Sequence, residues 1–168
     1  MLIAFCGLPG AGKSTLARTL GRSLRAPVLS VDPIEAALWH AGIDPNQPTG
    51  LAAYVVAETL AEQQLELGLT VVIDAANYVE PGRQMWRDLA ARQRVKLRWI
   101  EVVCTVDAVH RARIEARGVN IPGFYAVSWS DVLRRRTETD PWVDDRLVLD
   151  TAVADDHSLL ALAAAYVA

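Results

Sequence analysis

The sequence predicts a three-layer α/β domain in which helices cover both faces of a five-stranded parallel sheet. The chain has 168 residues, enough for a single domain over residues 1–168, and 52 % of them are hydrophobic. Short runs rich in Val, Ile and Leu alternate along the chain with longer helical stretches. A strand that is apolar on both sides must be covered on both faces, so this alternation favours a parallel sheet with crossover helices.

Five apolar runs are predicted as strands because Gly, Pro or Asp bounds each of them. These strands are Leu2 to Cys6, Pro27 to Val31, Leu69 to Asp74, Leu97 to Cys104 and Arg146 to Asp150. Helices are predicted at Gly12 to Arg25, Pro33 to His40, Leu51 to Leu67, Pro81 to Gln93, Val106 to Arg117, Ser128 to Arg136 and Asp156 to Val167. Ligands of such sheets bind beyond the carboxyl ends of the strands, so the residues that follow each strand are the candidates for function.

Composition narrows the classes of partner. The formal net charge is −3, and the sequence lacks the excess of Lys and Arg that binding to nucleic acid requires, so nucleic acid is an unlikely partner. The two cysteines, Cys6 and Cys104, each end an apolar run and are expected in the core. Neither a signal peptide nor an apolar stretch of about 18 residues is present, which predicts a cytoplasmic protein without membrane association.

One segment carries the strongest functional motif. Its residues are Gly7, Leu8, Pro9, Gly10, Ala11, Gly12, Lys13, Ser14 and Thr15. They match G-x-x-x-x-G-K-[S/T], the pattern of a phosphate-binding loop (P-loop), and lie between a predicted strand and a predicted helix, as this loop requires. We expect the backbone N–H groups to face the phosphates of ATP, Lys13 to reach the β- and γ-phosphates, and the Ser14 hydroxyl to ligate Mg²⁺.

Two carboxylates follow predicted strands. Asp32 comes after the second strand, where a hydroxyl that attacks phosphorus needs a proton acceptor, and is the candidate general base. A helix N-cap is the alternative, because Pro33 follows it directly. Asp74 ends the run Val-Val-Ile-Asp, a pattern typical of a carboxylate that holds Mg²⁺. Asn77 and Arg83 lie just beyond and are candidates for contact with the acceptor, or else turn and surface residues.

Two arginines share one face of a predicted helix. Arg113 and Arg117 are four residues apart, and two cations on one face repel unless an anion lies between them. The developing charge of a phosphoryl group would supply that anion, which makes Arg117 a candidate catalytic residue. A solvated face with Glu115 as partner is the alternative. Residues 118–140 then resemble a lid, whose Arg134, Arg135 and Arg136 either reach phosphate or are surface charges.

Taken in order, these motifs resemble the small P-loop kinases, which include polynucleotide 5′-hydroxyl kinase, chloramphenicol phosphotransferase, gluconate kinase and zeta-toxin kinases. The resemblance extends from Met1 to about Thr151. It implies the sheet order 2-3-1-4-5, Asp32 as base, Arg113 near the adenine and Arg117 on the phosphates. The sequence departs from polynucleotide kinase at the third strand, where Asp74 and Asn77 are separated by one additional residue.

The acceptor region is predicted to be acidic. No Lys or Arg occurs between Arg25 and Arg83. The same span contains Asp32, Glu35, Asp44, Glu58, Glu62, Glu66, Asp74 and Glu80. An anionic acceptor needs cations to replace its lost water, so this span favours a neutral or cationic acceptor. Glu35, Trp39 and Tyr54 are candidate acceptor contacts, although the two aromatic residues also suit the core.

The leading hypothesis is therefore an ATP- and Mg²⁺-dependent kinase that phosphorylates a hydroxyl of a small molecule. A kinase of nucleosides, nucleotides or polynucleotide 5′-hydroxyl ends is the alternative within the same class. A regulatory or switch NTPase without an acceptor is the alternative of another class. The sequence leaves open the identity of the acceptor, the choice between ATP and GTP, and the oligomeric state.

Overall fold

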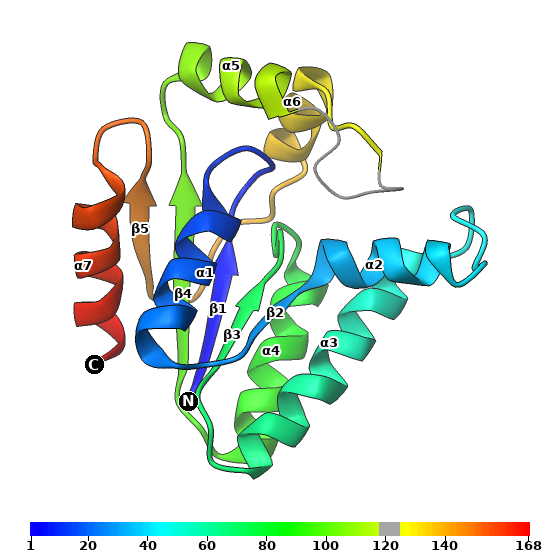
Figure 1. The fold of residues 1–168 in the computed structure, drawn as a ribbon, viewed down its shortest axis with the longest axis vertical. Coiled ribbons are helices and arrows are strands. Elements are labelled where there is room, and N and C mark those ends of the chain that lie inside the picture. Colours follow the sequence, from blue (N-terminus) through cyan, green and yellow to red (C-terminus); the bar gives the residue numbers. More distant parts are fainter. Residues whose placement is uncertain (118–124) are drawn as a thin grey trace.

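The computed structural model describes residues 1–117 and 125–168 of the chain. Its centre is a sheet of five parallel strands in the order β2-β3-β1-β4-β5 (Figure 1). The strands are β1 (Leu2–Cys6), β2 (Val28–Ser30), β3 (Val71–Asp74), β4 (Leu97–Val103) and β5 (Arg146–Asp150). The predicted fold class and strand order are confirmed. The lid prediction falls partly on residues 118–124, which lie outside the described residues.

Seven helices occur in the described part of the chain. They are α1 (Lys13–Leu24), α2 (Val31–His40), α3 (Thr49–Glu66), α4 (Glu80–Gln93), α5 (Asp107–Arg117), α6 (Trp129–Thr137) and α7 (Asp156–Val167). One departure from prediction is at β2, which ends at Ser30 because α2 begins two residues earlier than Pro33. Among the described residues, none of these helices is long and apolar enough to cross a membrane.

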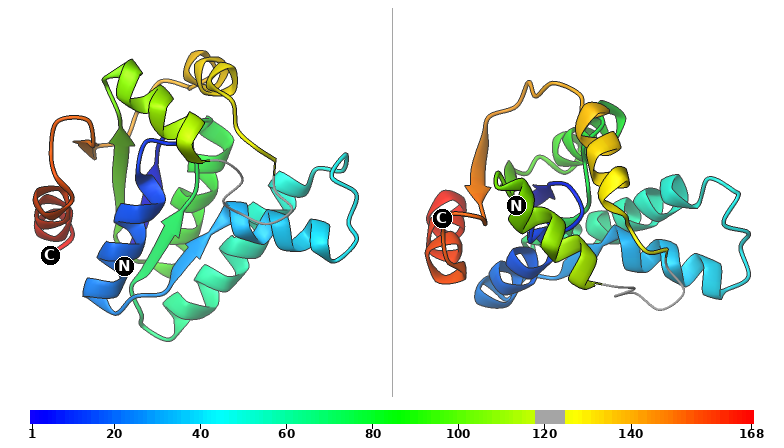
Figure 2. Two further views of the ribbon diagram at one scale, coloured as in Figure 1. Left: turned by 45° about the horizontal axis from the view of Figure 1, so that its top comes forward. Right: turned by 90° about the horizontal axis from the view of Figure 1, so that it is seen from above.

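Two hydrophobic cores flank the sheet and make the three layers (Figure 2). On one face, α3 contributes an alanine stripe at positions 53, 57 and 61, spaced so that one side of the helix packs closely on the strands. Trp86 and Leu89 of α4 complete this core. On the other face, Leu16 and Leu20 of α1 pack with Leu159 of α7. The central strand β1 supplies side chains to both cores, so its carboxyl end is held firmly where the P-loop begins.

Candidate active site

The phosphate-binding loop lies where β1 ends and α1 begins. Gly10 and Gly12 have φ angles of +79° and +96°, which residues with a side chain rarely adopt. A Cβ atom on Gly7 would lie 2.3 Å from the carbonyl oxygen of Val102, so β4 also requires glycine there. Helix α1 starts at Lys13 with no acidic residue in its first turn, and its positive end is therefore open to an anion.

Lys13 and Asp74 form a buried ion pair beside the loop. Nζ of Lys13 lies 2.7 Å from Oδ1 of Asp74, and the Ser30 hydroxyl donates to the same carboxylate at 3.0 Å. The Ser14 side chain is close enough to favour the ionised form of this carboxyl group as well. Burial opposes ionisation of this carboxyl group, but the Lys13 ammonium and the hydrogen bonds outweigh it and hold the pKa of Asp74 below its usual range. The carboxylate and the hydroxyl predicted to bind Mg²⁺ are thus brought together.

A cavity of about 340 Å³ opens in front of the loop. Four elements besides the P-loop and α1 contribute charged residues to its wall. These charged residues are Asp32 of α2, Arg113 of α5, Arg135 of α6 and Asp156 of α7. The volume lies within the range of about 300–1,000 Å³ that small-molecule sites occupy. The fold therefore gathers charges from distant parts of the sequence around one pocket.

Asp32 comes just after β2, as the sequence predicts, and lies in the first turn of α2. The N-cap position belongs to Ser30, so the alternative of a cap formed by Asp32 is not what the structure has. The Asp32 side chain is half-buried and makes no hydrogen bond or ion pair with any residue that the structure describes. A carboxylate on the pocket wall without a partner of its own is free to accept a proton or a hydrogen bond from a ligand.

Arg113 is anchored at the same pocket by Thr151. Nη1 and Nη2 of the arginine donate to Oγ1 and O of Thr151 at 2.6 and 2.9 Å. The Thr151 hydroxyl in turn donates to the carbonyl oxygen of Ala11 in the P-loop at 2.8 Å. The predicted second arginine, Arg117, ends α5, but its side chain lies outside the described residues.

The three arginines of α6 have different surroundings. Arg135 lies on the wall of the phosphate pocket and donates to the hydroxyl of Tyr125 at 2.7 Å. Arg134 pairs with acidic residues of its own helix region, Asp131 and Glu138. Arg136 pairs instead with Asp107 at the start of α5. Of these three arginines, Arg135 is the one that borders the pocket.

The candidate acceptor residues of α2 are joined to α3. The Thr49 hydroxyl donates to the Glu35 carboxylate at 2.8 Å and accepts from Nε1 of Trp39 at 2.9 Å. Trp39 also faces the ring of Tyr125, with 6.1 Å between ring centroids. Neither Glu35 nor Trp39 borders the phosphate pocket, so their proposed role depends on an acceptor that extends between α2 and the segment before α6.

Asn77 does not have the predicted role, because its polar groups are used inside the protein, and half-buried Tyr54 uses its hydroxyl on the same loop. The Asn77 side chain is 1 % exposed, donates to the carbonyl oxygen of Phe5 at 2.7 Å and accepts from Nε1 of Trp86 at 2.9 Å. The Tyr54 hydroxyl accepts from the backbone N–H of Asn77 at 3.2 Å, and burial raises the pKa of the Tyr54 phenol well above its ordinary value. Asn77 has a φ of +49°, and the network holds this loop in place.

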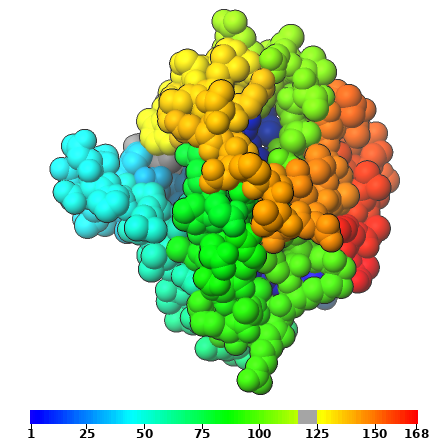
Figure 3. Space-filling view, turned by 180° about the vertical axis from the view of Figure 1, so that it is seen from behind, coloured from blue at the N-terminus to red at the C-terminus, as the bar shows by residue number. Residues whose placement is uncertain are grey.

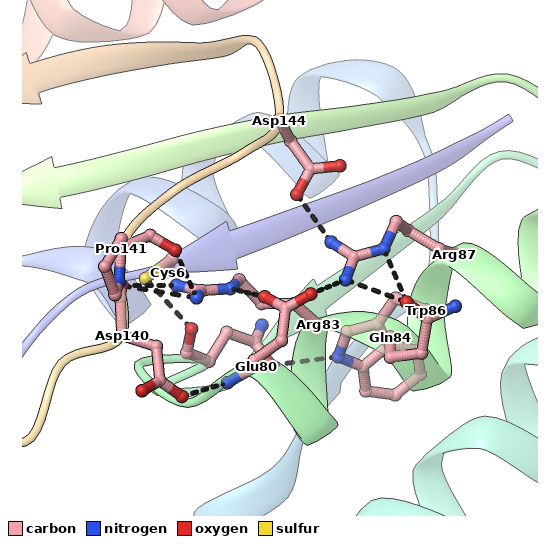
Figure 4. Close-up of polar contacts among 10 residues, drawn as sticks. Cys6, Glu80, Arg83, Gln84, Trp86, Arg87, Asp140, Pro141 and Asp144 are labelled. Atoms are coloured by element: carbon pink, nitrogen blue, oxygen red, sulfur yellow. Dashed lines mark hydrogen bonds and ion pairs between the residues drawn. The ribbon is translucent and has the colours of Figure 1, made fainter.

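The acceptor prediction is also wrong for Arg83, whose guanidinium is fully buried between α4 and the segment after α6 (Figure 4). Its nitrogen atoms donate to Glu80 and to the carbonyl oxygens of Asp140 and Pro141 at 2.9 to 3.3 Å. The guanidinium also lies over the ring of Trp142, 4.5 Å from its centroid. With an acceptor at each of its three nitrogen atoms, Arg83 fastens the segment after α6 to α4.

Sequence reasoning missed two residues at the loop. Thr151 directly follows β5, so the rule that functional residues follow strands could have found it. His110 of α5 is 1 % exposed, and its Nε2 lies 2.7 Å from the carbonyl oxygen of Pro9. In Figure 2, α5 passes above the P-loop, and a Cβ atom on Gly10 would meet Ile114 of this helix at 2.6 Å. No local pattern marks a histidine for this contact.

Solved structures share this fold over nearly the whole chain. A proposed kinase of Chloroflexus aurantiacus has a TM-score of 0.79 and 23 % identity, covering 98 % of this chain and 97 % of its own. Kti12 of Chaetomium thermophilum, solved with ADP-AlF3, has a TM-score of 0.74 and 16 % identity, with 100 % of both chains covered. A gluconokinase of Sinorhizobium meliloti 1021 has a TM-score of 0.68 and 17 % identity, covering 97 % of this chain and 89 % of its own.

No curated protein matches the sequence. A family model does: the model of the AAA domain matches residues 2–140, from the first strand to the segment that Arg83 fastens. This match includes the P-loop, Asp32, Asp74 and the whole of α5 and α6. The chain therefore belongs to the AAA domain family.

Proposed function

We propose that this protein is a phosphotransferase that moves the γ-phosphoryl group of ATP to a hydroxyl of a neutral or cationic small molecule. The observation that carries the proposal is the position of Asp32, a carboxylate without a described protein partner in the same cavity as the P-loop. A nucleotide switch has no need of a base beside the phosphates, whereas transfer to a hydroxyl does. The names of the structural neighbours, which include a sugar kinase and a gluconokinase, support the same class.

The residues around the loop fit a magnesium nucleotide. The cradle has no room for side chains at Gly7 and Gly10, and the helix end offers its N–H groups to an anion. Ser14 and Asp74 are adjacent oxygen donors of the kind that Mg²⁺ prefers, and they would hold the ion. When bound, Mg²⁺ would neutralise charge on the phosphate oxygens. Lys13 would add a positive charge at the same place.

On the acceptor side, Asp32 takes the proton from the attacking hydroxyl, while Arg113 and Arg135 supply positive charge at the pocket wall. Fewer acidic residues are available to contact an acceptor than the sequence suggests. Several acidic residues of this span already have cationic partners, namely Glu58 and Glu62 with Arg92, Glu80 with Arg83 and Arg87, and Asp74 with Lys13. Asp32 and Glu35 are the carboxylates that favour an uncharged or cationic acceptor.

The first test is ADP release against a panel of sugars, aminoglycosides, amino alcohols, nucleosides and oligonucleotides with a 5′-hydroxyl end. We expect a neutral or cationic alcohol to stimulate ADP release, and Lys13→Ala to abolish both nucleotide binding and release. Stimulation by the oligonucleotides alone, with a steep dependence on salt, would assign the polynucleotide alternative instead. No stimulation by any acceptor, with slow basal hydrolysis, would favour the switch NTPase.

The second test concerns Asp32. We expect Asp32→Asn to keep nucleotide affinity, measured by calorimetry, and to lower the transfer rate by about 10²-fold or more, because the variant lacks a proton acceptor. Asp44→Asn is the matched control, since it makes the same chemical change in an exposed loop. Equal transfer rates in Asp32→Asn and the control would remove Asp32 from the mechanism.

A further inference from the structure

A second cavity, of about 360 Å³, lies behind the phosphate-binding loop. Gly7 and Leu8 border both cavities, so the backbone of the loop is the partition between them. Seen from behind, the space-filling view shows atoms of the N-terminal segment at the bottom of a hollow (Figure 3). On one side of the hollow lie α6 and the segment that follows it (yellow and orange). On the other side lies the β4–α5 region (light green). The proposed phosphotransfer reaction makes no use of this space.

The floor of this rear cavity is the carboxyl end of the sheet. Cys6 of β1 and Glu101 of β4 are register partners in neighbouring parallel strands, so their side chains leave the same face at one level. Val103, two residues after Glu101, leaves that face as well. Burial raises the pKa of the Cys6 thiol to about 12, so this group remains neutral at physiological pH. The floor is thus largely apolar, with one carboxylate.

His110 and Glu101, which both line the cavity, each have a polar side-chain atom without a partner among the described residues. A carbonyl oxygen only accepts, so Nε2 of His110 must donate to Pro9. Nδ1 is buried and has no partner in the described part of the chain. Glu101 uses one carboxylate oxygen with Arg146 at 2.5 Å, and the described residues offer no donor to the other. The free carboxylate oxygen of Glu101 only accepts hydrogen bonds, so it favours a ligand that brings a donor.

We propose that the rear cavity is a second small-molecule site, which takes an aromatic or heteroaromatic amine. The ring packs on the apolar floor, and the amine donates to the free oxygen of Glu101. The size of the cavity matches fragments and small metabolites, since small-molecule sites begin at about 300 Å³. A ligand there touches the P-loop from behind, both at Gly7 and Leu8 and through the contact between His110 and Pro9. Its binding is therefore expected to alter nucleotide affinity, and nucleotide binding to alter its affinity equally.

The test uses phenethylamine, tryptamine and 2-aminobenzimidazole as probes, with ethylbenzene as the ring that lacks an amine. Binding to the full chain is measured by saturation-transfer NMR and calorimetry. At least one amine is expected to bind, and ethylbenzene at least about tenfold more weakly, because it cannot donate to the carboxylate. Absence of binding by all three amines would overturn the proposal.

Two variants locate the binding. Val103→Phe fills the cavity and should abolish binding, whereas Glu101→Gln keeps the shape and should weaken it about tenfold or more. Glu58→Gln is the matched control, because Glu58 also pairs with an arginine, Arg92 at 2.9 Å, but lies on α3. It should leave binding unchanged. Glu101→Gln decides the question even where Val103→Phe fails to fold, and wild-type affinity in Glu101→Gln would refute the site.

The nucleotide pocket is the competing location for the probes. With the nucleotide analogue AMPPNP added in increasing amounts, binding behind the loop predicts an apparent Kd that reaches a plateau. A Kd that rises in proportion to the AMPPNP concentration would place the probes in the phosphate pocket and overturn the proposal.

Discussion

Arg83 is a charged residue whose role is to stabilise the fold and not to contact a ligand. Its side chain is fully buried, yet four hydrogen bonds and the ring of Trp142 replace the water that the guanidinium loses. Two of its acceptor groups are carbonyl oxygens of the segment after α6. Because a planar guanidinium can reach both at once, lysine cannot replace arginine here.

Replacement of Arg83 should therefore reduce stability. We expect Arg83→Met to lower the free energy of unfolding by about 2–4 kcal/mol, because the carbonyl groups of Asp140 and Pro141 lose their donors. Arg83→Lys should recover little of this loss. Urea denaturation followed by circular dichroism measures the effect. Arg92→Met, which removes a half-exposed arginine from a surface ion pair, should cost less than about 1 kcal/mol. A similar loss in both variants would contradict the assigned role.

At the scale of elements, close contact between backbones decides where glycine is required. Gly21 lies on the buried side of α1 and faces β2, and a Cβ atom there would lie 2.2 Å from Cγ2 of Val28. Glycine inside a helix is normally unfavourable by about 1 kcal/mol relative to alanine. Here it allows α1 to approach the edge of the sheet and so helps to set the position of the P-loop at the other end of the helix.

This contact reverses the usual effect of alanine in a helix. We expect Gly21→Ala to destabilise the protein by about 1–3 kcal/mol, as in other overpacked cores, instead of stabilising it. In a Val28→Ala background the same change should cost much less, because the methyl group at 2.2 Å is gone and the closest remaining neighbour is the carbonyl oxygen of Ala26 at 3.2 Å. A double-mutant cycle in urea measures this coupling. If the effects of the two substitutions are additive, α1 moves away from β2 without loss of stability, and the proposed clash is contradicted.

The extent to which structure could be predicted from sequence also differs between elements. The P-loop and the five strands were predictable because their signals are local: a motif of nine residues, and apolar runs bounded by turn residues. The roles of Asn77 and Arg83 were not, because their partners Phe5 and Asp140 are 72 and 57 residues away. A polar side chain close to a strand end looks the same in sequence whether it faces a ligand or the protein interior.

At the scale of the whole molecule, the ion pair between Lys13 and Asp74 joins α1 to β3, the strand next to the central strand β1. The pKa of Asp74 is lower in the folded protein than in the unfolded chain, so the folded state gains stability wherever the carboxyl group is ionised in both. This gain is present above the unfolded pKa near 3.9 and is lost as the pH falls through the lower folded pKa. Unfolding is cooperative, so the loss affects the entire domain.

We expect the stability of Asp74→Asn to depend less on pH than that of the wild type between pH 5 and about pH 2. Urea midpoints across this range measure the difference. The amide cannot titrate, so the acid-dependent part of the ion pair is absent from the variant. Parallel pH profiles for the two proteins would show that this pair contributes nothing to acid sensitivity.

The order of the strands has one further consequence, for the behaviour of the protein at high concentration. Strands β2 and β5 are the two edges of the sheet, where unpaired backbone groups can recruit another chain. Edge β2 has only three residues, and edge β5 begins with Arg146 and ends with Asp150. A short edge and a charged edge both resist the addition of a further strand. The chain is thus protected against edge-to-edge aggregation at both sides of its sheet.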